Sequence, residues 1–121
     1  MKKLRWGLLS TARINRAVIP PIRASLQSEL KAVASRDSVK ARAYAKEWQI
    51  PHAYGSYEEL LADKSIDAIY IPLPNHLHVE WAIKAMEAGK HVLCEKPMAL
   101  DVAGAERMVA AGRAHGVRLG V

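Results

Sequence analysis

The sequence has a single cysteine and no long uninterrupted apolar segment, and both absences narrow the class of protein. Cys94 cannot form a disulfide within the chain, which excludes the disulfide-rich small secreted domains. No stretch is long enough to cross a bilayer as a helix. The apolar run that follows the first basic residues breaks at Ser10 and Thr11, unlike a signal peptide. We therefore expect a cytoplasmic protein with no membrane partner.

Internal repeats, low-complexity segments and linkers are also absent. A chain of 121 residues with 50% hydrophobic and 25% charged residues has the composition of a globular domain, so we expect one domain over residues 1–121. Val117 is expected to begin a strand, and the chain stops soon afterwards at Val121. We therefore expect this domain to be the front part of a longer protein.

Positive charge exceeds negative charge: 18 Lys and Arg residues against 12 Asp and Glu residues give a net charge of +6. The basic residues are scattered, and no run of them alternates with exposed aromatic residues as in nucleic-acid-binding surfaces. A positive charge also attracts anionic small molecules. We expect such a ligand and no nucleic acid, whose binding would instead show a steep salt dependence.

Short apolar runs alternate with segments of helical periodicity along the whole chain. This alternation predicts right-handed βαβ units, and therefore an α/β fold with a doubly wound parallel sheet. The strands are expected at Leu4–Leu9, Leu30–Ala34, Ala53–Tyr54, Asp67–Ile71, Val92–Cys94 and from Val117 onwards.

The helices between these strands have recognisable starts and interruptions. Apolar residues repeat at helical spacing from Ile14 to Pro21, and Pro20 and Pro21 are expected to kink or restart this helix because neither donates a backbone hydrogen bond. Gly89 and Gly116 are expected to end two later helices. The predicted caps are Asp37 or Ser38, Ser56 with Glu59, Asn75 and Asp101.

Glu95, Lys96 and Pro97 follow the apolar strand that contains Cys94. Ligands bind at the carboxyl ends of the strands in an open α/β sheet, so Lys96 lies where chemistry is expected. Pro97 restricts the backbone of Lys96 and so helps to aim its side chain. A surface ion pair between Glu95 and Lys96 is the alternative interpretation. We interpret Cys94 as a small core residue rather than a nucleophile.

The first turn lacks the three glycines of the dinucleotide fingerprint and has Ser10, Ala12 and Asn15 at those positions. Ser10 and Ala12 are small enough for a tight turn, and the helix start that follows offers free N–H groups to a phosphate. Ser10, Thr11 and Asn15 could instead be capping residues of the helix.

Ser35, Arg36 and Asp37 follow the second strand. An acid at this strand end suits the ribose hydroxyl of NAD, whereas an arginine suits the 2′-phosphate of NADP. Ser35 occupies the acidic position, with Arg36 beside it and Lys40 one turn later, which favours NADP over NAD. Alternatively, Arg36 is a solvated charge and Asp37 only a helix cap.

Two prolines make the turn after the fourth strand, Pro72 to His78, a stiff wall. His76 and His78 are two residues apart and would not share a helix face, and no paired cysteines lie nearby. We therefore expect no metal here. A wall beside a cofactor is the better interpretation.

Four segments together resemble one enzyme family: R-W-G-L-L-S-T-A-R-I from residue 5, S-R-D from 35, P-L-P-N-H-L-H from 72 and A-G-K-H-V-L-C-E-K-P from 88. They are similar to the Gfo/Idh/MocA family of NAD(P)-dependent oxidoreductases, and most similar to its branch of glucose-fructose oxidoreductases, xylose dehydrogenases and dihydrodiol dehydrogenases. The resemblance covers essentially the whole chain.

The resemblance implies a Rossmann domain with strand order 3-2-1-4-5-6 and a C-terminal substrate domain that this chain lacks. Lys96 would match the active-site lysine, with Glu95 and Pro97 as its companions. The other cofactor-binding positions would be Ser10, Thr11, Ala12, Arg13 and Ile14 at the pyrophosphate, Ser35, Arg36 and Lys40 at the adenosine end, and Leu73, Pro74, Asn75 and His78 on the wall leading to nicotinamide.

The function implied is hydride transfer between NADP, or NAD as second choice, and a carbon of a sugar or polyol. The family's aspartate and histidine that complete proton transfer belong to the second domain. We therefore expect this chain alone to bind dinucleotide without turnover, and the full-length enzyme to be a homo-oligomer. A non-catalytic dinucleotide sensor or scaffold on the same fold is the alternative.

Overall fold

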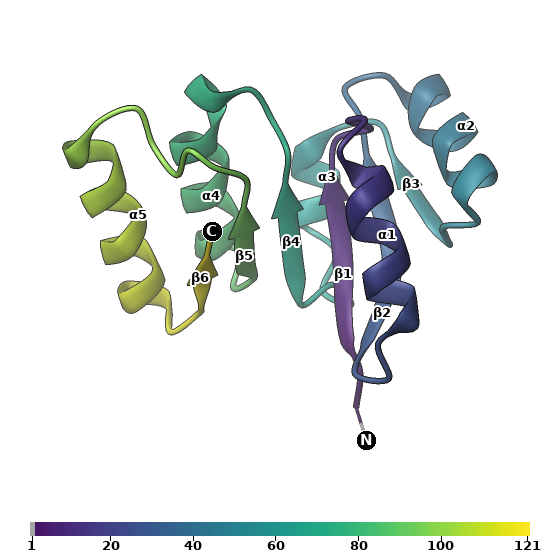
Figure 1. The fold of residues 1–121 in the computed structure, drawn as a ribbon, viewed down its shortest axis with the longest axis horizontal. Coiled ribbons are helices and arrows are strands. Elements are labelled where there is room, and N and C mark those ends of the chain that lie inside the picture. The colour runs from purple at the N-terminus through teal and green to yellow at the C-terminus, as the bar shows by residue number, and fades with distance from the viewer. Residues whose placement is uncertain (1) are drawn as a thin grey trace.

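Six strands alternate with helices in the computed structural model, which describes residues 2–121 (Figure 1). The strands are β1 Leu4–Leu9, β2 Ser28–Ala34, β3 His52–Tyr54, β4 Ala68–Ile71, β5 His91–Cys94 and β6 Leu119–Gly120. The helices are α1 Asn15–Ala24, α2 Ser38–Trp48, α3 Tyr57–Leu61, the 3₁₀ helix η1 Asn75–Leu77, α4 His78–Glu87 and α5 Val102–His115.

All the strand pairs are parallel, and the sheet has the order β3-β2-β1-β4-β5-β6. The order reverses between β1 and β4, as it does in the doubly wound dinucleotide-binding folds. The predicted fold class and strand order are therefore confirmed.

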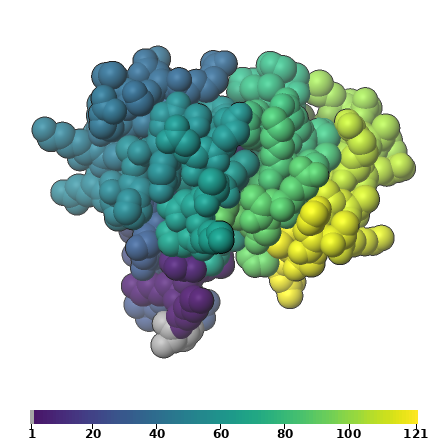
Figure 2. All heavy atoms as spheres, turned by 180° about the vertical axis from the view of Figure 1, so that it is seen from behind, coloured from purple at the N-terminus to yellow at the C-terminus, as the bar shows by residue number. Residues whose placement is uncertain are grey.

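Helices cover the two faces of the sheet with separate apolar clusters. On one face, Ile19 and Ile22 of α1 and Ala45 of α2 pack with Leu8 of β1. On the other, α3, α4 and α5 pack with Leu9 of the same strand. In Figure 1, α1 lies in front of the sheet and α3 behind it. Figure 2 shows the rear, where α3 (teal) and α4 (green) lie side by side with the C-terminal segment (yellow).

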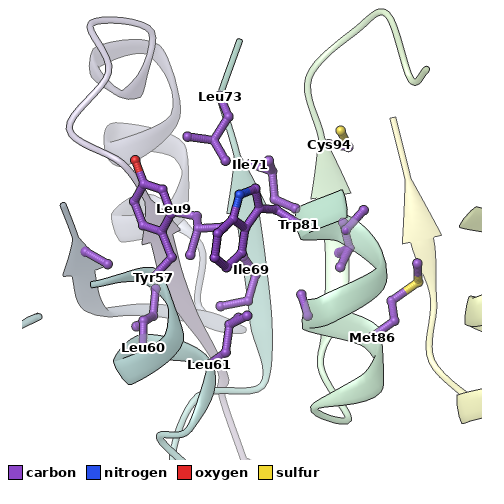
Figure 3. Packing of buried hydrophobic residues seen from close by; sticks show 14 of the residues in the cluster. Leu9, Tyr57, Leu60, Leu61, Ile69, Ile71, Leu73, Trp81, Met86 and Cys94 are labelled. Atoms are coloured by element: carbon purple, nitrogen blue, oxygen red, sulfur yellow. The ribbon is translucent and has the colours of Figure 1, made fainter. Parts of the chain in front are cut away.

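The rear cluster contains an aromatic pair. The rings of Tyr57 and Trp81 meet edge to face, with centroids 5.1 Å apart and an angle of 85° between their planes. Trp81 lies between Tyr57 and the side chains of β4, and the hydroxyl of Tyr57 points toward the end of the sheet where Leu73 lies (Figure 3). This packing fixes the start of α3 against the sheet.

The predicted caps are confirmed at three helices. The Asp37 side chain accepts from the amides of α2, Ser56 and Glu59 pair at the start of α3, and Asp101 accepts from the amide of Gly104 in α5. These side chains satisfy amides that have no partner within their helices.

The prediction that Asn75 caps a helix is wrong. The chain turns through η1 before α4 begins, and the amide of Leu77 donates to the carbonyl of Pro74 over 2.9 Å. No side-chain bond caps either helix. A backbone turn therefore makes the connection that the amide side chain was expected to make.

Pro20 and Pro21 were expected to kink or restart the first helix, and the restart is wrong, because α1 continues through both prolines to Ala24. Both proline side chains are exposed, while Ile19 and Ile22 are buried against the sheet. This burial offsets the two hydrogen bonds that the prolines cannot donate.

The charged side chains at the amino edge of the sheet are paired or buried. The Arg5 guanidinium makes two bonds of 3.0 Å to the Asp67 carboxylate, which lowers the pKa of Asp67. Lys90 is 3% exposed, and its ammonium group donates to the carbonyls of Asp63 and Ile66, each over 2.8 Å. Burial lowers the pKa of Lys90. These contacts tie the α3–β4 loop to the end of α4.

No helix among residues 2–121 has the length and apolar character needed to cross a membrane.

The loop before β4 contains an acid that should couple stability to pH. The hydroxyl of Tyr54 donates to Asp63 over 2.6 Å and, together with Ser65, lowers the pKa of that carboxyl from 3.8 to about 2. Because the folded-state pKa is depressed, the stabilisation is present above the ordinary pKa and is lost as the pH falls through the folded value.

We therefore expect Tyr54→Phe to lower the free energy of unfolding at pH 7 by about 1 kcal/mol, since Asp63 is half-exposed and solvent weakens the contact. The variant should also lose less stability than the wild type between about pH 4 and pH 2. Urea unfolding at several pH values measures both effects, and Asp63→Asn should flatten the same interval. An unchanged acid dependence in both variants would contradict this assignment.

Candidate functional site

The carboxyl ends of the parallel strands lie at one edge of the sheet, the upper edge in Figure 1. The turns after β1, β2, β4 and β5 leave the sheet there. All the candidate residues predicted from the sequence lie on these four turns or in the first turn of the helix that follows. The sheet thus gathers segments that are far apart in the sequence.

The turn after β1 has an unusual backbone at Ser10, whose φ is 144°. Residues other than glycine rarely adopt this region of φ, because doing so costs roughly 1–3 kcal/mol of conformational free energy. Two contacts hold the turn: the Ser10 hydroxyl accepts from the amide of Ala12 over 3.2 Å, and the Asn15 amide group donates to the Ser10 carbonyl over 2.9 Å. Ser10 thus has the conformation that the first glycine of the fingerprint usually supplies.

The alternative interpretation of Ser10, Thr11 and Asn15 as caps of α1 is wrong. Ile14 is the N-cap residue and makes no side-chain capping bond. The amides of Arg13 and Ile14 donate to no acceptor in the described part of the chain. The helix therefore begins with free donors and a partial positive charge, an arrangement that suits an anion.

A cavity of about 420 Å³ lies between this turn and the turn after β2. Ser35 is 7% exposed, and its hydroxyl accepts from the amide of Asp37 over 3.2 Å. The Asp37 carboxylate accepts from two amides of α2, at 2.9 and 3.3 Å, so the cap interpretation of Asp37 is correct. The residues that line the cavity are Ser10, Thr11, Ser35, Arg36, Asp37, Lys40 and Tyr57.

Sequence reasoning missed Tyr57. This residue follows the carboxyl end of β3 and begins α3, so the rule that selected the other turns applied here as well. Burial raises the pKa of the Tyr57 hydroxyl, and the nearby Arg36 guanidinium opposes the rise. The hydroxyl and the guanidinium therefore lie near each other in the lining of the cavity.

The turn after β4 presents Pro74 and Asn75 to solvent, with Leu73 buried beneath them. His78 is fully buried, and its Nε2 and Nδ1 atoms each lie 2.7 Å from a carbonyl oxygen, those of Leu73 and Pro97. His78 thus lies behind the wall and links the turns after β4 and β5, rather than forming part of the surface.

In the turn after β5, the side chains of Glu95 and Lys96 have different surroundings. The Tyr70 hydroxyl donates to Glu95 over 2.5 Å, and burial together with this carboxylate raises the pKa of Tyr70. No ion pair joins Glu95 to Lys96 within residues 2–121, so the ion-pair interpretation is not supported. The Lys96 side chain is exposed, and the Lys96–Pro97 peptide bond is cis.

Cys94, the residue before this turn, is 1% exposed, and burial raises the pKa of its thiol to about 11. A protonated, enclosed thiol is a poor nucleophile. The interpretation of Cys94 as a core residue is therefore confirmed.

The candidate residues form two groups at the same edge. The first lines the cavity, and neither the β4 turn nor Glu95, Lys96 and Pro97 contributes to its lining. No group of three or more His, Cys, Asp or Glu side chains in the described part of the chain is placed to hold a metal ion. The edge as a whole therefore offers a charged cavity at one end and an exposed lysine at the other.

Residues 4–121 match the model of a family described as "Oxidoreductase family, NAD-binding Rossmann fold", designated GFO_IDH_MocA. The chain belongs to the Gfo/Idh/MocA family. The predicted resemblance is thereby confirmed, and with it the assignment of the chain to the NAD-binding Rossmann fold of an oxidoreductase family.

Curated relatives from other organisms share much of this sequence. An uncharacterized oxidoreductase of Rhizobium meliloti is 54% identical over 110 residues, which cover 90% of this chain and 33% of that protein. A D-xylose 1-dehydrogenase (NADP(+)) of Haloferax volcanii is 55% identical over 96 residues, 78% of this chain and 29% of that protein. The chain thus spans about a third of the length of these relatives.

One solved structure similar to this chain is that of KijD10, a 3-ketoreductase from Actinomadura kijaniata, in complex with TDP-benzene and NADP. The two superpose with a TM-score of 0.92 at 37% sequence identity, over 98% of this chain and 37% of that one. The present chain therefore has the fold of the matched part of KijD10.

The buried hydroxyl of Tyr70 should stabilise the strand end that carries Lys96. Tyr70→Phe keeps the ring in the core but leaves the Glu95 carboxylate without its donor, so we expect the free energy of unfolding at pH 7 to fall by about 1–2 kcal/mol. Tyr44→Phe is the matched control, because the buried Tyr44 hydroxyl has no partner within residues 2–121. Urea unfolding of both variants tests the assignment, and equal losses would contradict it.

Proposed function

We propose that this chain binds NADP(H) along the carboxyl edge of its sheet and is the cofactor domain of a dehydrogenase that acts on a sugar or polyol. The observation that supports it most directly is the cavity beside Ser35, which is lined by two cations, Arg36 and Lys40. Guanidinium and ammonium groups bind a phosphate well. The extra phosphate of NADP is the part that distinguishes it from NAD.

The one acid in this lining does not oppose a phosphate directly. Asp37 uses its carboxylate to cap α2, so it is engaged with the amides of Val39 and Lys40. At the position of the usual ribose-binding acid stands Ser35, a hydroxyl that can donate to a phosphate. We therefore favour NADP over NAD.

The turn after β1 fits the pyrophosphate of a dinucleotide. The free amides at Arg13 and Ile14 and the start of α1 supply donors, and the small side chains of Ser10 and Ala12 permit a close approach. Thr11 lines the cavity and adds a hydroxyl between the pyrophosphate and the adenosine end.

The second group of residues would lie at the nicotinamide end. Pro74 and Asn75 form an exposed surface that Leu73 and His78 support from beneath. Glu95 is held by Tyr70, and Pro97 is held through its carbonyl by His78, so the turn that carries Lys96 has a fixed frame. A rigid frame is what a positioned catalytic side chain requires.

Lys96 is the proposed catalytic residue. Its exposed ammonium group would donate a hydrogen bond to the reacting oxygen of the substrate and stabilise negative charge there as the hydroxyl proton leaves. When bound, the nicotinamide supplies the acceptor for the hydride. The lysine thus aligns and polarises the carbon–oxygen bond.

The names and lengths of the relatives are the basis for proposing a substrate class and further parts of the enzyme. Those with similar sequence are named as a xylose dehydrogenase and a 1,5-anhydro-D-fructose reductase, both about three times as long as the matched region. We propose a sugar or polyol substrate, a further substrate domain in the longer protein, a homo-oligomeric assembly and a cytoplasmic location. Residues 1–121 alone would then bind dinucleotide without turning over a sugar.

Titration of the chain with NADPH and NADH at fixed moderate salt tests the cofactor assignment. We expect saturable binding that prefers NADPH. Arg36→Ala should weaken NADPH by roughly 10- to 150-fold, the loss of a charge-assisted contact, and NADH by much less. Arg42→Ala, an exposed cation of α2 outside the cavity, is the control and should change neither affinity. Equal losses for both nucleotides in Arg36→Ala would contradict the phosphate role.

The role of Lys96 is tested in the longer enzyme. Lys96→Met should slow hydride transfer by roughly 100-fold or more, because a positioned proton donor contributes about that much. The NADPH affinity should change far less, since the ammonium group acts on the substrate oxygen. Single-turnover absorbance at the nicotinamide band separates the two effects, and unchanged turnover would rule out the catalytic role.

A further inference from the structure

The first position of the turn after β1 is a serine rather than a glycine, yet its backbone has the positive φ that glycine favours. Ser10 has a φ of 144°, which a serine rarely adopts without support. One side chain contacts the carbonyl of this strained residue: the amide nitrogen of Asn15 donates to it over 2.9 Å. Asn15 is itself the residue at the third glycine position of the fingerprint.

Asn15 is a costly residue at its position. It is fully buried at the first turn of α1, on the same side as Ile19 and Ile22, and its Oδ1 atom has no hydrogen-bond partner within residues 2–121. The Tyr44 hydroxyl of α2 is likewise buried and unpaired, and Asn15 lies close enough to offset part of the burial-driven rise in the pKa of Tyr44. An apolar side chain of the same size would fill this space without an unpaired oxygen.

We propose that Asn15 is a positioning residue that holds Ser10 in its positive-φ conformation, and so lets a turn without glycine present its amides to a pyrophosphate. The bond from Asn15 fixes the direction of the Ser10 carbonyl. That direction sets the course of the chain through Thr11 and Ala12 to the free amides of Arg13 and Ile14. The effect on pyrophosphate binding rests on the proposed function, whereas the effect on the conformation of Ser10 does not.

A purely structural role for Asn15 makes different predictions. Asn15 does not cap α1, because the N-cap is Ile14 and has no side-chain bond. If Asn15 served only to fill space, a leucine would replace it without effect on Ser10. If it served only to hold the helix, its loss would matter equally whether residue 10 were serine or glycine.

The test combines Asn15→Leu with Ser10→Gly, since glycine reaches a positive φ without support. In the wild-type background, Asn15→Leu should weaken NADPH binding roughly tenfold or more, as expected for a lost buried hydrogen bond and the carbonyl it leaves unpaired. In the Ser10→Gly background, the same substitution should change the affinity by less than about threefold. Asn15→Ala is measured in the same way if Asn15→Leu does not fold.

A second measurement needs no ligand. The three-bond coupling between the amide and α protons of Ser10 reports its φ, and a 13.3 kDa chain is suited to this NMR measurement. We expect a positive φ in the wild type and a shift to negative values in Asn15→Leu. If the wild type fails to bind either nucleotide while φ still shifts, the proposed function is overturned and the holding role of Asn15 is supported.

Two results would overturn the inference itself. One is a Ser10 φ that stays positive in Asn15→Leu. The other is an affinity loss of the same size in the serine and glycine backgrounds, which would make Asn15 a general support of the helix.

Discussion

The burial of β1 on both faces is the constraint on which the rest of the structure depends. Leu8 and Leu9 are adjacent, point to opposite faces and are both fully buried in different apolar clusters. A strand enclosed in this way cannot present chemistry along its length, so any ligand must meet the sheet at an end. At the amino end, Arg5 pairs with Asp67 and two carbonyls hold the Lys90 ammonium group. The carboxyl end is the open edge, where the amides of Arg13 and Ile14 have no acceptor within residues 2–121.

Buried polar side chains support the exposed ones along that open edge. Asn15 holds the carbonyl of Ser10, Tyr70 holds the carboxylate of Glu95, and His78 lies between two carbonyls of neighbouring turns. Each of these supporting groups is fully or almost fully enclosed by the core. Because such bonds are made away from water, they give the turns a defined shape at the edge where water is present.

The fold was predictable because its signals are local. Apolar strands alternate with helices along the chain. Asp37, Ser56 and Asp101 cap three of these helices, and each cap is visible in a sequence pattern a few residues long. The errors came from tertiary contacts: burial of Ile19 and Ile22 carries α1 through its prolines, which local propensity forbids. Likewise, the predicted wall residue His78 turned out to be enclosed, because Pro97, which contacts it, is far away in the sequence. The bond from Asn15 to Ser10 spans few residues, but it depends on a backbone conformation that the residue types do not reveal.

The buried ammonium group of Lys90 gives this chain an internal standard for chemical labelling. Its nitrogen is held by two carbonyl oxygens and is hidden from solvent, whereas Lys40 and Lys96 are exposed at the open edge. An amine-reactive reagent therefore meets the exposed lysines in the folded chain and reaches Lys90 only when the loop before β4 opens. The ratio of the two reactions reports local opening at the amino edge separately from ligand protection at the carboxyl edge.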